Sequence, residues 1–400
     1  MNASDSTPTL AASAIAAQVA KDYQCVALVL QGGGALGAYQ AGVVEALEAA
    51  QLRPDWVAGI SIGALNAAII AGNPPERRVE RLRAFWERIC QPPSWLAAPQ
   101  WFDRQRLPAS VQNGFSGLAA WRALVEGQPG FFRPRLPPPF LQMSPSAATA
   151  SWYDTTPLKA TLEQLADFDR INDAKAMRVS VGAVNVRTGN FVYFDNATQR
   201  LRPEHFMASG ALPPGFSAVR IDGKYYWDGG VVSNTPLFRV LNEQPRRDML
   251  VLQVDLWSAR GEVPRDMAGV ADRTKEIQYS SRTRMITDAM HESRRRQRLL
   301  HDLMRLVPAG KRDNPAFRRA AQEACGSVAN VIHLIYRDKP YEGHYKDFEF
   351  SAASMQSHWH SGLADMQRTL AHPQWFATPS TDDPFVTHDV HRKLAAVRPS

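Results

Sequence analysis

The sequence predicts an α/β fold, and two features of the chain support this prediction. Short apolar segments with the length of buried strands alternate with longer segments that have helical periodicity. The chain of 400 residues is also 44% hydrophobic, which is enough for one large α/β domain with insertions or for two domains. We therefore expect strands and helices to alternate around a sizeable core.

The first strand and the first long helix flank a glycine-rich loop. Residues 26–30 are predicted as a buried strand and residues 35–50 as a helix, with Gly32, Gly33 and Gly34 between them. A loop of this kind can aim backbone N–H groups at a negative charge. It is therefore a candidate site for an anionic group or intermediate.

The same glycines also allow a second interpretation. Together with Gly37 they satisfy the dinucleotide-binding pattern G-x-G-x-x-G, and Asp55 follows at about the expected distance. In that fingerprint the acid ends the second strand, whereas Asp55 precedes the next predicted strand, residues 56–58. This order argues against dinucleotide binding.

A serine lies at the turn between the second strand and the second helix. Residues 61–71 are predicted as an alanine-rich helix, and Gly59, Ser61 and Gly63 form a G-x-S-x-G motif at its start. Such a turn exposes its serine for nucleophilic attack, and the helix N-terminus favours negative charge nearby. The motif also occurs by chance, so its position between strand and helix is what favours catalysis. Serine and glycine loop together offer the nucleophile and the oxyanion hole of acyl transfer.

The later elements continue the same pattern. We predict a helix at residues 158–165 and strands at residues 177–186, 190–194, 224–228 and 248–256. The aromatic strand 224–228 ends at Asp228, and Gly229 and Gly230 after it allow a tight turn. This acid is the third candidate catalytic element.

With these three motifs in this order, the chain resembles the patatin-like phospholipase family. The resemblance extends over residues 24–255, and residues 208–216 also resemble the segment that precedes the family's Asp motif. The resemblance implies a three-layer α/β/α fold around a central, mostly parallel sheet. It also implies a serine acyl hydrolase that cleaves lipid acyl esters, like a phospholipase A or a lysophospholipase.

The resemblance further implies a catalytic dyad in which Ser61 is the nucleophile and Asp228 is the base. The oxyanion hole would lie at Gly32, Gly33 and Gly34, most directly at the last two. The family often has a basic residue in this loop, where this chain has Leu36. The remaining motif glycines would support these elements: Gly37, Gly59, Gly63, Gly229 and Gly230.

Other interpretations of the function stay open at this stage. A histidine-based triad could use His205, His291, His333 or His344, and His333 lies in a predicted strand where a core histidine is the default. The substrate could be another hydrophobic ester rather than a lipid. The same fold could also serve as a non-catalytic lipid-binding module, although the presence of all three motifs argues against it.

The remaining segments divide the chain further. Residues 1–23 are expected to be a flexible arm or a short helix, and residues 91–150 a lid, an acyl-binding cap or a structural insertion, because they are rich in proline and aromatic residues. Residues 256–377 form an α-rich region that resembles an uncharacterised segment of some bacterial patatin-like proteins. Residues 378–400 are polar and are expected to be largely disordered.

Within the α-rich region the sequence predicts three elements. A long basic helix covers residues 272–306, a strand covers residues 331–336, and a helix capped by Ser351 ends near residue 370. Arginines at positions 294, 295, 296 and 298 lie in the basic helix. The first interpretation of this cluster is a solvated helix face, and the second is contact with an anionic membrane surface.

Composition limits the class of protein. The net charge is +7, but no nucleic-acid-binding module is present, so we expect no nucleic-acid partner. No spacing of cysteine, histidine or carboxylate residues resembles a metal site, and we expect neither a metal nor another cofactor. Three widely spaced cysteines, no signal-like N-terminus and no apolar run of spanning length lead us to expect a cytoplasmic protein, peripheral to membranes at most. The sequence does not predict an oligomeric state.

Overall fold

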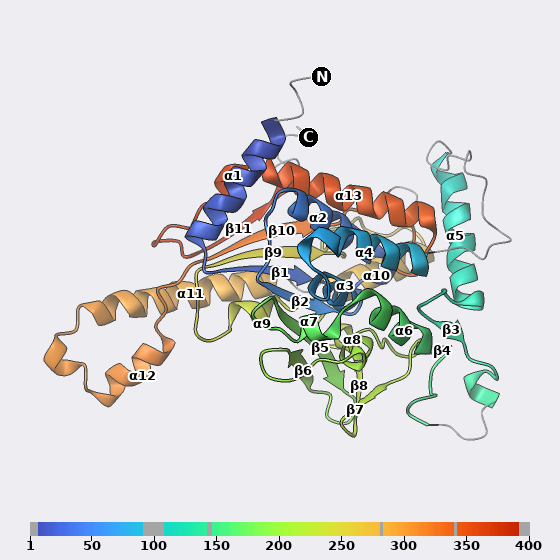
Figure 1. The fold of residues 1–400 in the computed structure, drawn as a ribbon, viewed down its shortest axis with the longest axis horizontal. Coiled ribbons are helices and arrows are strands. Elements are labelled where there is room, and N and C mark those ends of the chain that lie inside the picture. Colours follow the sequence, from blue (N-terminus) through green and yellow to red (C-terminus); the bar gives the residue numbers. More distant parts are fainter. Residues whose placement is uncertain (1–6, 91–107, 142–145, 281–282, 340–341, 392–400) are drawn as a thin grey trace.

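The computed structural model describes residues 7–90, 108–141, 146–280, 283–339 and 342–391. In these residues a nine-stranded sheet forms the centre of the molecule, and helices cover both of its faces (Figure 1). The strand order is β11-β10-β9-β1-β2-β5-β8-β7, with β6 paired to β5. The first six strands are parallel, and β6, β7 and β8 are antiparallel.

The strands of the central sheet come from most of the chain. They are β1 (Cys25–Leu30), β2 (Trp56–Ile60), β5 (Arg178–Asn185), β6 (Phe191–Asp195), β7 (Val219–Ile221), β8 (Lys224–Asp228), β9 (Met249–Asp255), β10 (Ala329–Ile335) and β11 (Phe385–Asp389). A separate two-stranded sheet pairs β3 (Arg133–Pro134) with β4 (Tyr153–Asp154).

Register brings the three sequence motifs to one edge of the sheet. Leu30 at the end of β1 lies opposite Gly59 on β2, so the glycine loop and the serine turn leave neighbouring strands side by side. Ile60 lies opposite Gly182 on β5, and Asp228 at the end of β8 lies opposite Ala183, the next residue of β5. Asp228, the last residue of the antiparallel strand β8, therefore lies at the same edge of the sheet as the end of β2.

Two cores enclose the parallel strands. Side chains of β1 alternate between them: Val26, Leu28 and Leu30 enter one core and Ala27 and Val29 the other. Continuous apolar strands are typical of a parallel sheet that is covered on both faces. The larger core packs against helices that include α2, α3, α4 and α13, and the smaller one against α9 and α11, which makes three layers.

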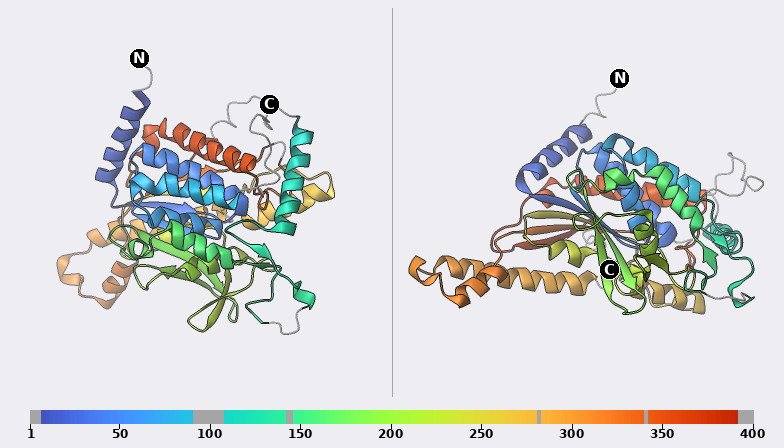
Figure 2. Two further views of the ribbon diagram at one scale, coloured as in Figure 1. Left: turned by 45° about the vertical axis from the view of Figure 1, so that its right-hand side comes forward. Right: turned by 60° about the horizontal axis from the view of Figure 1, so that its bottom comes forward.

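The helices have the following bounds: α1 (Thr7–Asp22), α2 (Ala38–Ala49), α3 (Ile62–Ala71), α4 (Pro75–Ile89), α5 (Ala109–Glu126), α6 (Thr156–Leu165), α7 (Phe168–Ile171), α8 (Pro203–Ser209), α9 (Leu237–Leu241), α10 (Met267–Tyr279), α11 (Thr283–Arg305), α12 (Pro315–Glu323) and α13 (Ala352–Leu370). Short 3-10 helices include η1 (Gly34–Gly37), η4 (Pro139–Leu141) and η5 (Gly229–Val231). The α11–α12 segment projects at one end of the molecule and α5 stands at the other (Figures 1 and 2).

The structure corrects several expectations for the outer segments. The predicted helix 272–306 is two helices, α10 and α11, and residues 281–282 between them lie outside the described part. The tail from residue 378 is not wholly disordered, because β11 pairs with β10 and buries Phe385; residues 392–400 lie outside the described part. Of the two alternatives for residues 1–23, the structure shows the helix, α1, which buries Ile15 and Val19.

The basic cluster on α11 is not a uniform solvated face. Arg294 is only 4% exposed and donates hydrogen bonds to the Leu241 carbonyl oxygen at 2.7 Å and to the Ser327 hydroxyl at 3.2 Å. Arg296 and Arg298 instead form ion pairs with acids one turn away on the same helix. Arg294 therefore ties α11 to the body of the protein.

Residues 91–150 contain more regular structure than the sequence suggests. Helix α5 occupies residues 109–126, and strand β3 and helix η4 follow it. Residues 91–107 and 142–145 lie outside the described part. None of the helices in the described part has both the length and the apolar character needed to span a bilayer.

Candidate active site

Ser61 occupies the strained turn between β2 and α3. Its backbone has φ 55° and ψ −126°, a conformation that residues other than glycine rarely adopt. A Cβ at Gly63 would lie 2.4 Å from the Leu30 carbonyl oxygen, so only glycine lets α3 approach β1 this closely. The turn has the backbone form of a nucleophile elbow.

Asp228 faces Ser61 from the end of β8. Its side chain is 1% exposed and accepts hydrogen bonds from the Ser61 hydroxyl and, at 2.7 Å, from the Gly230 N–H group. Gly229 and Gly230 open η5 directly after it. The structure thus brings the second and third sequence motifs into direct contact.

The surroundings of Asp228 make its carboxylate unusually basic. Burial raises its pKa from 3.8 to about 7, and the hydrogen bonds from Ser61 and Gly230 lower it only in part. The two groups that lower this pKa are uncharged. A carboxylate of this kind can exchange protons near neutral pH.

The glycine loop lies beside this pair. A Cβ at Gly32 would lie 2.9 Å from the Ser61 Cβ atom, which places the start of the loop against the serine. The Gly32 N–H group already donates to the Asn234 carbonyl oxygen at 3.2 Å. Among the described residues, the N–H groups of Gly33 and Gly34 have no acceptor. Two donors are therefore available in the loop, one and two residues after Gly32.

Comparison with known proteins identifies the family of the chain. The family model described as patatin-like phospholipase matches residues 28–241, more than half of the chain. The chain belongs to the patatin-like phospholipase family. A second model, described as patatin phospholipase, matches residues 277–382, which accounts for the additional C-terminal region. Family membership indicates a lipid hydrolase, and the α/β fold with a mostly parallel sheet is confirmed.

Two solved structures also resemble the chain. The crystal structure of VipD from Legionella pneumophila is 14% identical, with a TM-score of 0.38, and the match covers 92% of this chain and 72% of VipD. Human GIVD cytosolic phospholipase A2 is 12% identical, with a TM-score of 0.37, and the match covers 94% of this chain and 65% of that protein. No curated protein matches the chain.

A further serine supports the patatin-like elbow. The Ser209 hydroxyl accepts a hydrogen bond from the Ser61 N–H group at 3.0 Å and donates to the Gly182 carbonyl oxygen at 2.6 Å. Two residues later, the Ala211 carbonyl oxygen accepts from the Asp228 N–H group at 3.0 Å. The end of α8 and the residues that follow it therefore hold both members of the pair in place. From the sequence alone, residues 208–216 have no predicted role beyond their resemblance to a segment of the family.

The C-terminal region contacts the glycine loop directly. The Asp347 carbonyl oxygen accepts a hydrogen bond from the Ala35 N–H group at 2.8 Å. Gly34 has φ +55°, and a Cβ there would lie 2.0 Å from that oxygen, so glycine is required for the contact. The Trp257 indole donates to the Gly32 carbonyl oxygen at 3.0 Å. Residues far downstream of the patatin-like motifs thus fix the loop from both ends.

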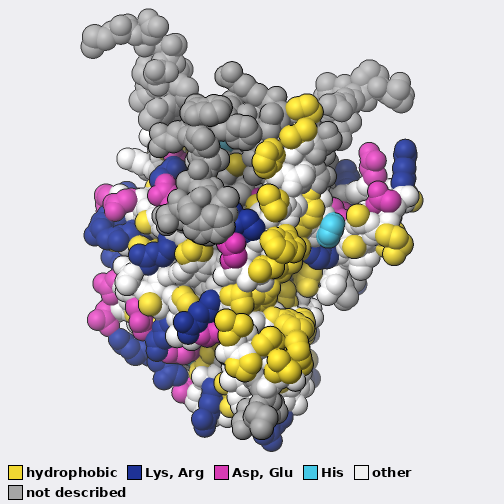
Figure 3. Space-filling model, turned by 90° about the vertical axis from the view of Figure 1, so that its right-hand side faces the viewer, with side chains coloured by type: hydrophobic (Ala, Val, Ile, Leu, Met, Phe, Trp, Pro, Cys, Tyr) yellow, Lys and Arg dark blue, Asp and Glu magenta, His cyan; other side chains and the backbone are white. Residues whose placement is uncertain are grey.

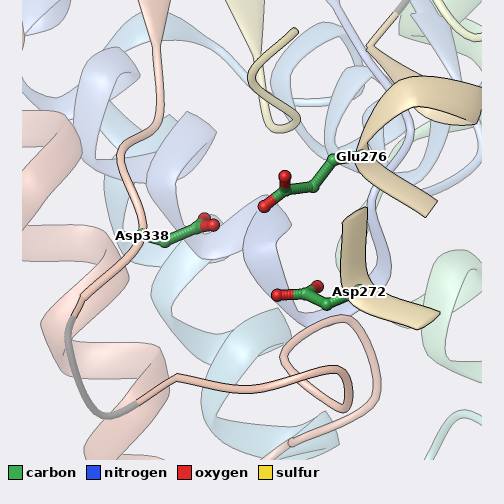
Figure 4. Close-up of side chains that lie close together, drawn as sticks. All are labelled: Asp272, Glu276 and Asp338. Atoms are coloured by element: carbon green, nitrogen blue, oxygen red, sulfur yellow. The ribbon is translucent and has the colours of Figure 1, made fainter. Parts of the chain in front are cut away.

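Three acidic side chains surround a lysine next to this contact. Asp272, Glu276 and Asp338 point toward one another from α10 and from the segment after β10 (Figure 4). Such a set could hold a metal ion, but the Lys346 ammonium lies 3.1, 2.9 and 2.6 Å from their oxygens. The ammonium therefore pairs with all three acidic groups and anchors the chain beside Asp347. Sequence spacing did not reveal this group, because its members are up to 74 residues apart.

The four candidate histidines lie elsewhere in the patatin-like fold. In the described chain none of them forms a hydrogen bond with Ser61 or Asp228. His205 accepts from the Arg202 N–H group at 2.8 Å at the start of α8, and His291 pairs with Asp383 at 3.1 Å. His333 lies in β10, where burial lowers its pKa to about 4, and His344 packs its ring against Tyr345.

Proposed function

We propose that this protein is a serine acyl hydrolase that cleaves the acyl esters of lipids through Ser61 and Asp228. The observation that carries the proposal is the hydrogen bond from a serine hydroxyl on a strained elbow to a buried carboxylate. Nucleophile and base must be within hydrogen-bond reach for direct proton transfer. Membership of the patatin-like phospholipase family supports a lipid ester as the substrate class.

In the first half of the reaction, the Ser61 oxygen attacks the ester carbonyl carbon while Asp228 accepts the hydroxyl proton. The carbonyl oxygen becomes an oxyanion, and the free N–H groups of Gly33 and Gly34 are the donors that would stabilise it. One such donor lowers the barrier by about 3 kcal/mol. The N–H group of Gly32 is already bonded to Asn234, so we assign Gly32 the role of letting the loop approach Ser61.

In the second half, Asp228 returns the proton to the departing alcohol oxygen as the carbon–oxygen bond breaks. An acyl-serine remains, and a water molecule attacks it while Asp228 again accepts a proton. The tetrahedral intermediate formed by the water then collapses: the bond between the acyl carbon and the Ser61 oxygen breaks, and Asp228 returns its proton to that oxygen. This step releases the fatty acid and restores the Ser61 hydroxyl. A pKa of about 7 suits both directions of transfer, because the carboxylate is a stronger base than an ordinary aspartate.

The test is hydrolysis of a panel that contains a diacyl phospholipid, a lysophospholipid, a triacylglycerol and a short-chain nitrophenyl ester. We expect release of fatty acid from at least one lipid, and none from the Ser61→Ala variant. Hydrolysis confined to the short-chain ester would indicate an esterase for other hydrophobic substrates. No turnover of any ester, with vesicle binding retained, would indicate a non-catalytic lipid-binding module.

A further inference from the structure

Helix α5 presents its large apolar side chains to solvent. Its outward residues are between 40% and 59% exposed: Val111, Phe115, Leu118, Trp121, Leu124 and Val125. Its buried residues are small, namely Ser116, Ala120 and Ala123. A surface helix normally buries its large apolar face against the core. In α5 this arrangement is inverted.

The inverted face follows helical spacing. Residues 111, 115, 118, 121 and 125 lie three or four positions apart, which aligns them along one side of the helix. Scattered single apolar residues on a surface need no explanation, but a continuous apolar stripe marks a site of interaction. The outer side of α5 is therefore suited to a partner with an apolar surface.

The stripe continues beyond the helix. Four residues of the loops around β3 and β4 are between 49% and 87% exposed: Leu136, Phe140, Leu141 and Trp152. Figure 3 shows hydrophobic side chains gathered in a band along this end of the molecule. We call these four residues, with the six outward residues of α5, the apolar band.

The apolar band is joined to the candidate active site through backbone hydrogen bonds. The Trp152 N–H group donates to the Pro214 carbonyl oxygen at 3.2 Å, and the Tyr153 N–H group to Gly215 at 2.9 Å. Pro214 and Gly215 belong to the segment that begins at Ser209, which holds the serine elbow. The band is thus hydrogen-bonded to the same segment that contacts Ser61.

Exposed apolar residues also occur directly beside the dyad and on α10. Val231 and Val232, which follow Gly230, are 45% and 56% exposed. Met267 and Ile277 on α10 are exposed as well, and both ribbon views place α10 at the same end of the molecule as α5 (Figures 1 and 2). Helix α10 thus adds exposed apolar side chains to the end of the molecule that carries the apolar band, and Val231 and Val232 add them beside the dyad.

We propose that the apolar band docks the protein onto a lipid–water interface, so that the active site faces the aggregated lipid it hydrolyses. This inference rests on the proposed function. The exposed Arg265 lies two residues before α10, where it would meet headgroup phosphates, whereas Arg133 beside the band is paired with Asp154 at 2.9 Å. A lipid surface fits better than a second copy of the chain, because the exposed Val231 and Val232 provide further apolar surface beside the dyad, which the lipid substrate has to reach.

Insertion of apolar side chains supplies most of the attraction. Binding should therefore occur on zwitterionic vesicles and depend little on salt, unlike attraction between charges, whose range shrinks to about 3 Å at 1 M salt. This differs from a membrane contact made through the arginines of α11, where Arg294 is buried and Arg296 and Arg298 are paired, so that of the four arginines of the cluster only Arg295 is exposed without an ion pair among the described residues.

The first experiment measures vesicle binding without catalysis. Ser61→Ala protein is co-sedimented with phosphatidylcholine vesicles, with and without 20% phosphatidylglycerol (about that fraction suffices to add surface charge). The test variant carries Leu118→Gln, Trp121→Gln and Val125→Gln. A matched control carries Leu299→Gln, Leu303→Gln and Leu306→Gln, three leucines 52–78% exposed at the far end of the molecule.

We expect the test variant to lose at least about tenfold in affinity for both kinds of vesicle and the control to lose little. Equal binding by both variants would overturn the proposal. So would a dimer of the unaltered protein, seen by sedimentation velocity, that the test variant alone abolishes, because the band would then be an interface between copies.

The second experiment separates this inference from the proposed function. In protein with Ser61 intact, the test variant should hydrolyse a monomeric short-chain ester at the normal rate and vesicle phospholipid at least about tenfold more slowly. Equal loss on both substrates would contradict docking as the role of the band. If no ester is hydrolysed at all, the proposed function fails, while the binding result still decides the inference.

Discussion

Two buried aspartates of the same sheet show how different surroundings shift the pKa of a carboxyl group in opposite directions. Asp195 ends β6 and Asp228 ends β8, and both strands pair with β5. The two side chains are equally inaccessible, at 2% and 1% exposure. Burial, strand position and residue type are thus matched between them.

Their partners differ. Asp195 forms ion pairs with Arg178 at 2.9 Å and Arg239 at 3.1 Å and accepts a hydrogen bond from the Ser180 hydroxyl at 2.7 Å. Burial opposes the ionised form, but Arg178 and Ser180 together hold the pKa of Asp195 below its usual value. Asp228 has a hydroxyl and an N–H group in place of the arginines, so burial raises its pKa to about 7.

The comparison teaches that burial raises the pKa of Asp228 because, among the described residues, no cation offsets it as Arg178 does for Asp195. A carboxylate paired with arginine stays ionised and is a weak base, which suits a structural ion pair. A buried carboxylate without a cation lowers the stability of the folded protein when it is ionised, but it is a stronger base. The following changes test this difference.

The largest effect is expected from Ser61→Ala. Removal of a nucleophile lowers kcat by about three to six orders of magnitude, and the fold should persist because alanine occupies the elbow with less side chain. Activity on the preferred ester and thermal unfolding would be measured together. Near-normal turnover would show that Ser61 is not the nucleophile.

Asp228→Asn and Asp195→Asn should have opposite consequences. Asp228→Asn should lower kcat by at least about three orders of magnitude, because an amide cannot accept the proton. Asp195→Asn should leave kcat within a few-fold but lower the free energy of unfolding by about 1–3 kcal/mol, because Arg178 and Arg239 lose their buried partner and keep only Glu243. Both quantities would be measured at pH 8.

Asp228→Asn should also raise the stability at pH 8. The folded-state pKa of Asp228 lies above its unfolded value, so the folded protein loses stability as pH rises from about 4 through 7. Asparagine removes that penalty. As controls, alanine variants of His205, His291, His333 and His344 should keep activity, and one as inactive as Ser61→Ala would replace the dyad with a triad.

The pH dependence of kcat/KM provides a third test. Asp228 must be ionised to accept the serine proton, so kcat/KM should fall as pH drops below about 7 and level off above it. The profile would be measured on a neutral ester to keep the substrate charge constant. An apparent pKa near 4 would mean that Asp228 behaves like an ordinary carboxylate, and it would contradict the difference drawn between Asp228 and Asp195.

A smaller effect is expected from Trp257→Phe. This change removes the hydrogen bond to the Gly32 carbonyl oxygen but keeps an aromatic ring in place. We expect kcat to fall by about five- to tenfold with KM unchanged, since one hydrogen bond contributes about 1 kcal/mol and the loop acts on the oxyanion. An increase in KM alone would show that Trp257 serves substrate binding instead.

The sequence alone predicted the parts that depend on neighbouring residues. Strands such as β1 and β9 are continuous apolar runs, and the elbow around Ser61 is encoded in five consecutive residues, so both could be found by pattern. Asp228 was found because glycines follow it directly. The break between α10 and α11 and the short strand β11 lack such local signals, because pairing with β10 is what fixes β11.

The supports of the site could not be predicted for a different reason. Asp347 acts through its backbone oxygen, which any residue could provide, and it meets Ala35 across more than 300 residues. Ser209 and Trp257 are single side chains whose roles come from tertiary contacts. The burial of Arg294 likewise depends on a tertiary contact, its hydrogen bond to the Leu241 carbonyl oxygen. The arginines next to it in the sequence suggested a charged surface instead.

The central claim is that Ser61 is activated by Asp228, and the most direct measurement is the rate of labelling by a fluorophosphonate. The rate would be followed against pH in the unaltered protein, Asp228→Asn and Asp195→Asn, with the labelled residue identified by peptide mass. We predict one label per chain on Ser61, a rate that falls below about pH 7, a loss of at least about a hundredfold in Asp228→Asn, and little change in Asp195→Asn. Labelling at another residue, or an unchanged rate in Asp228→Asn, would contradict the account.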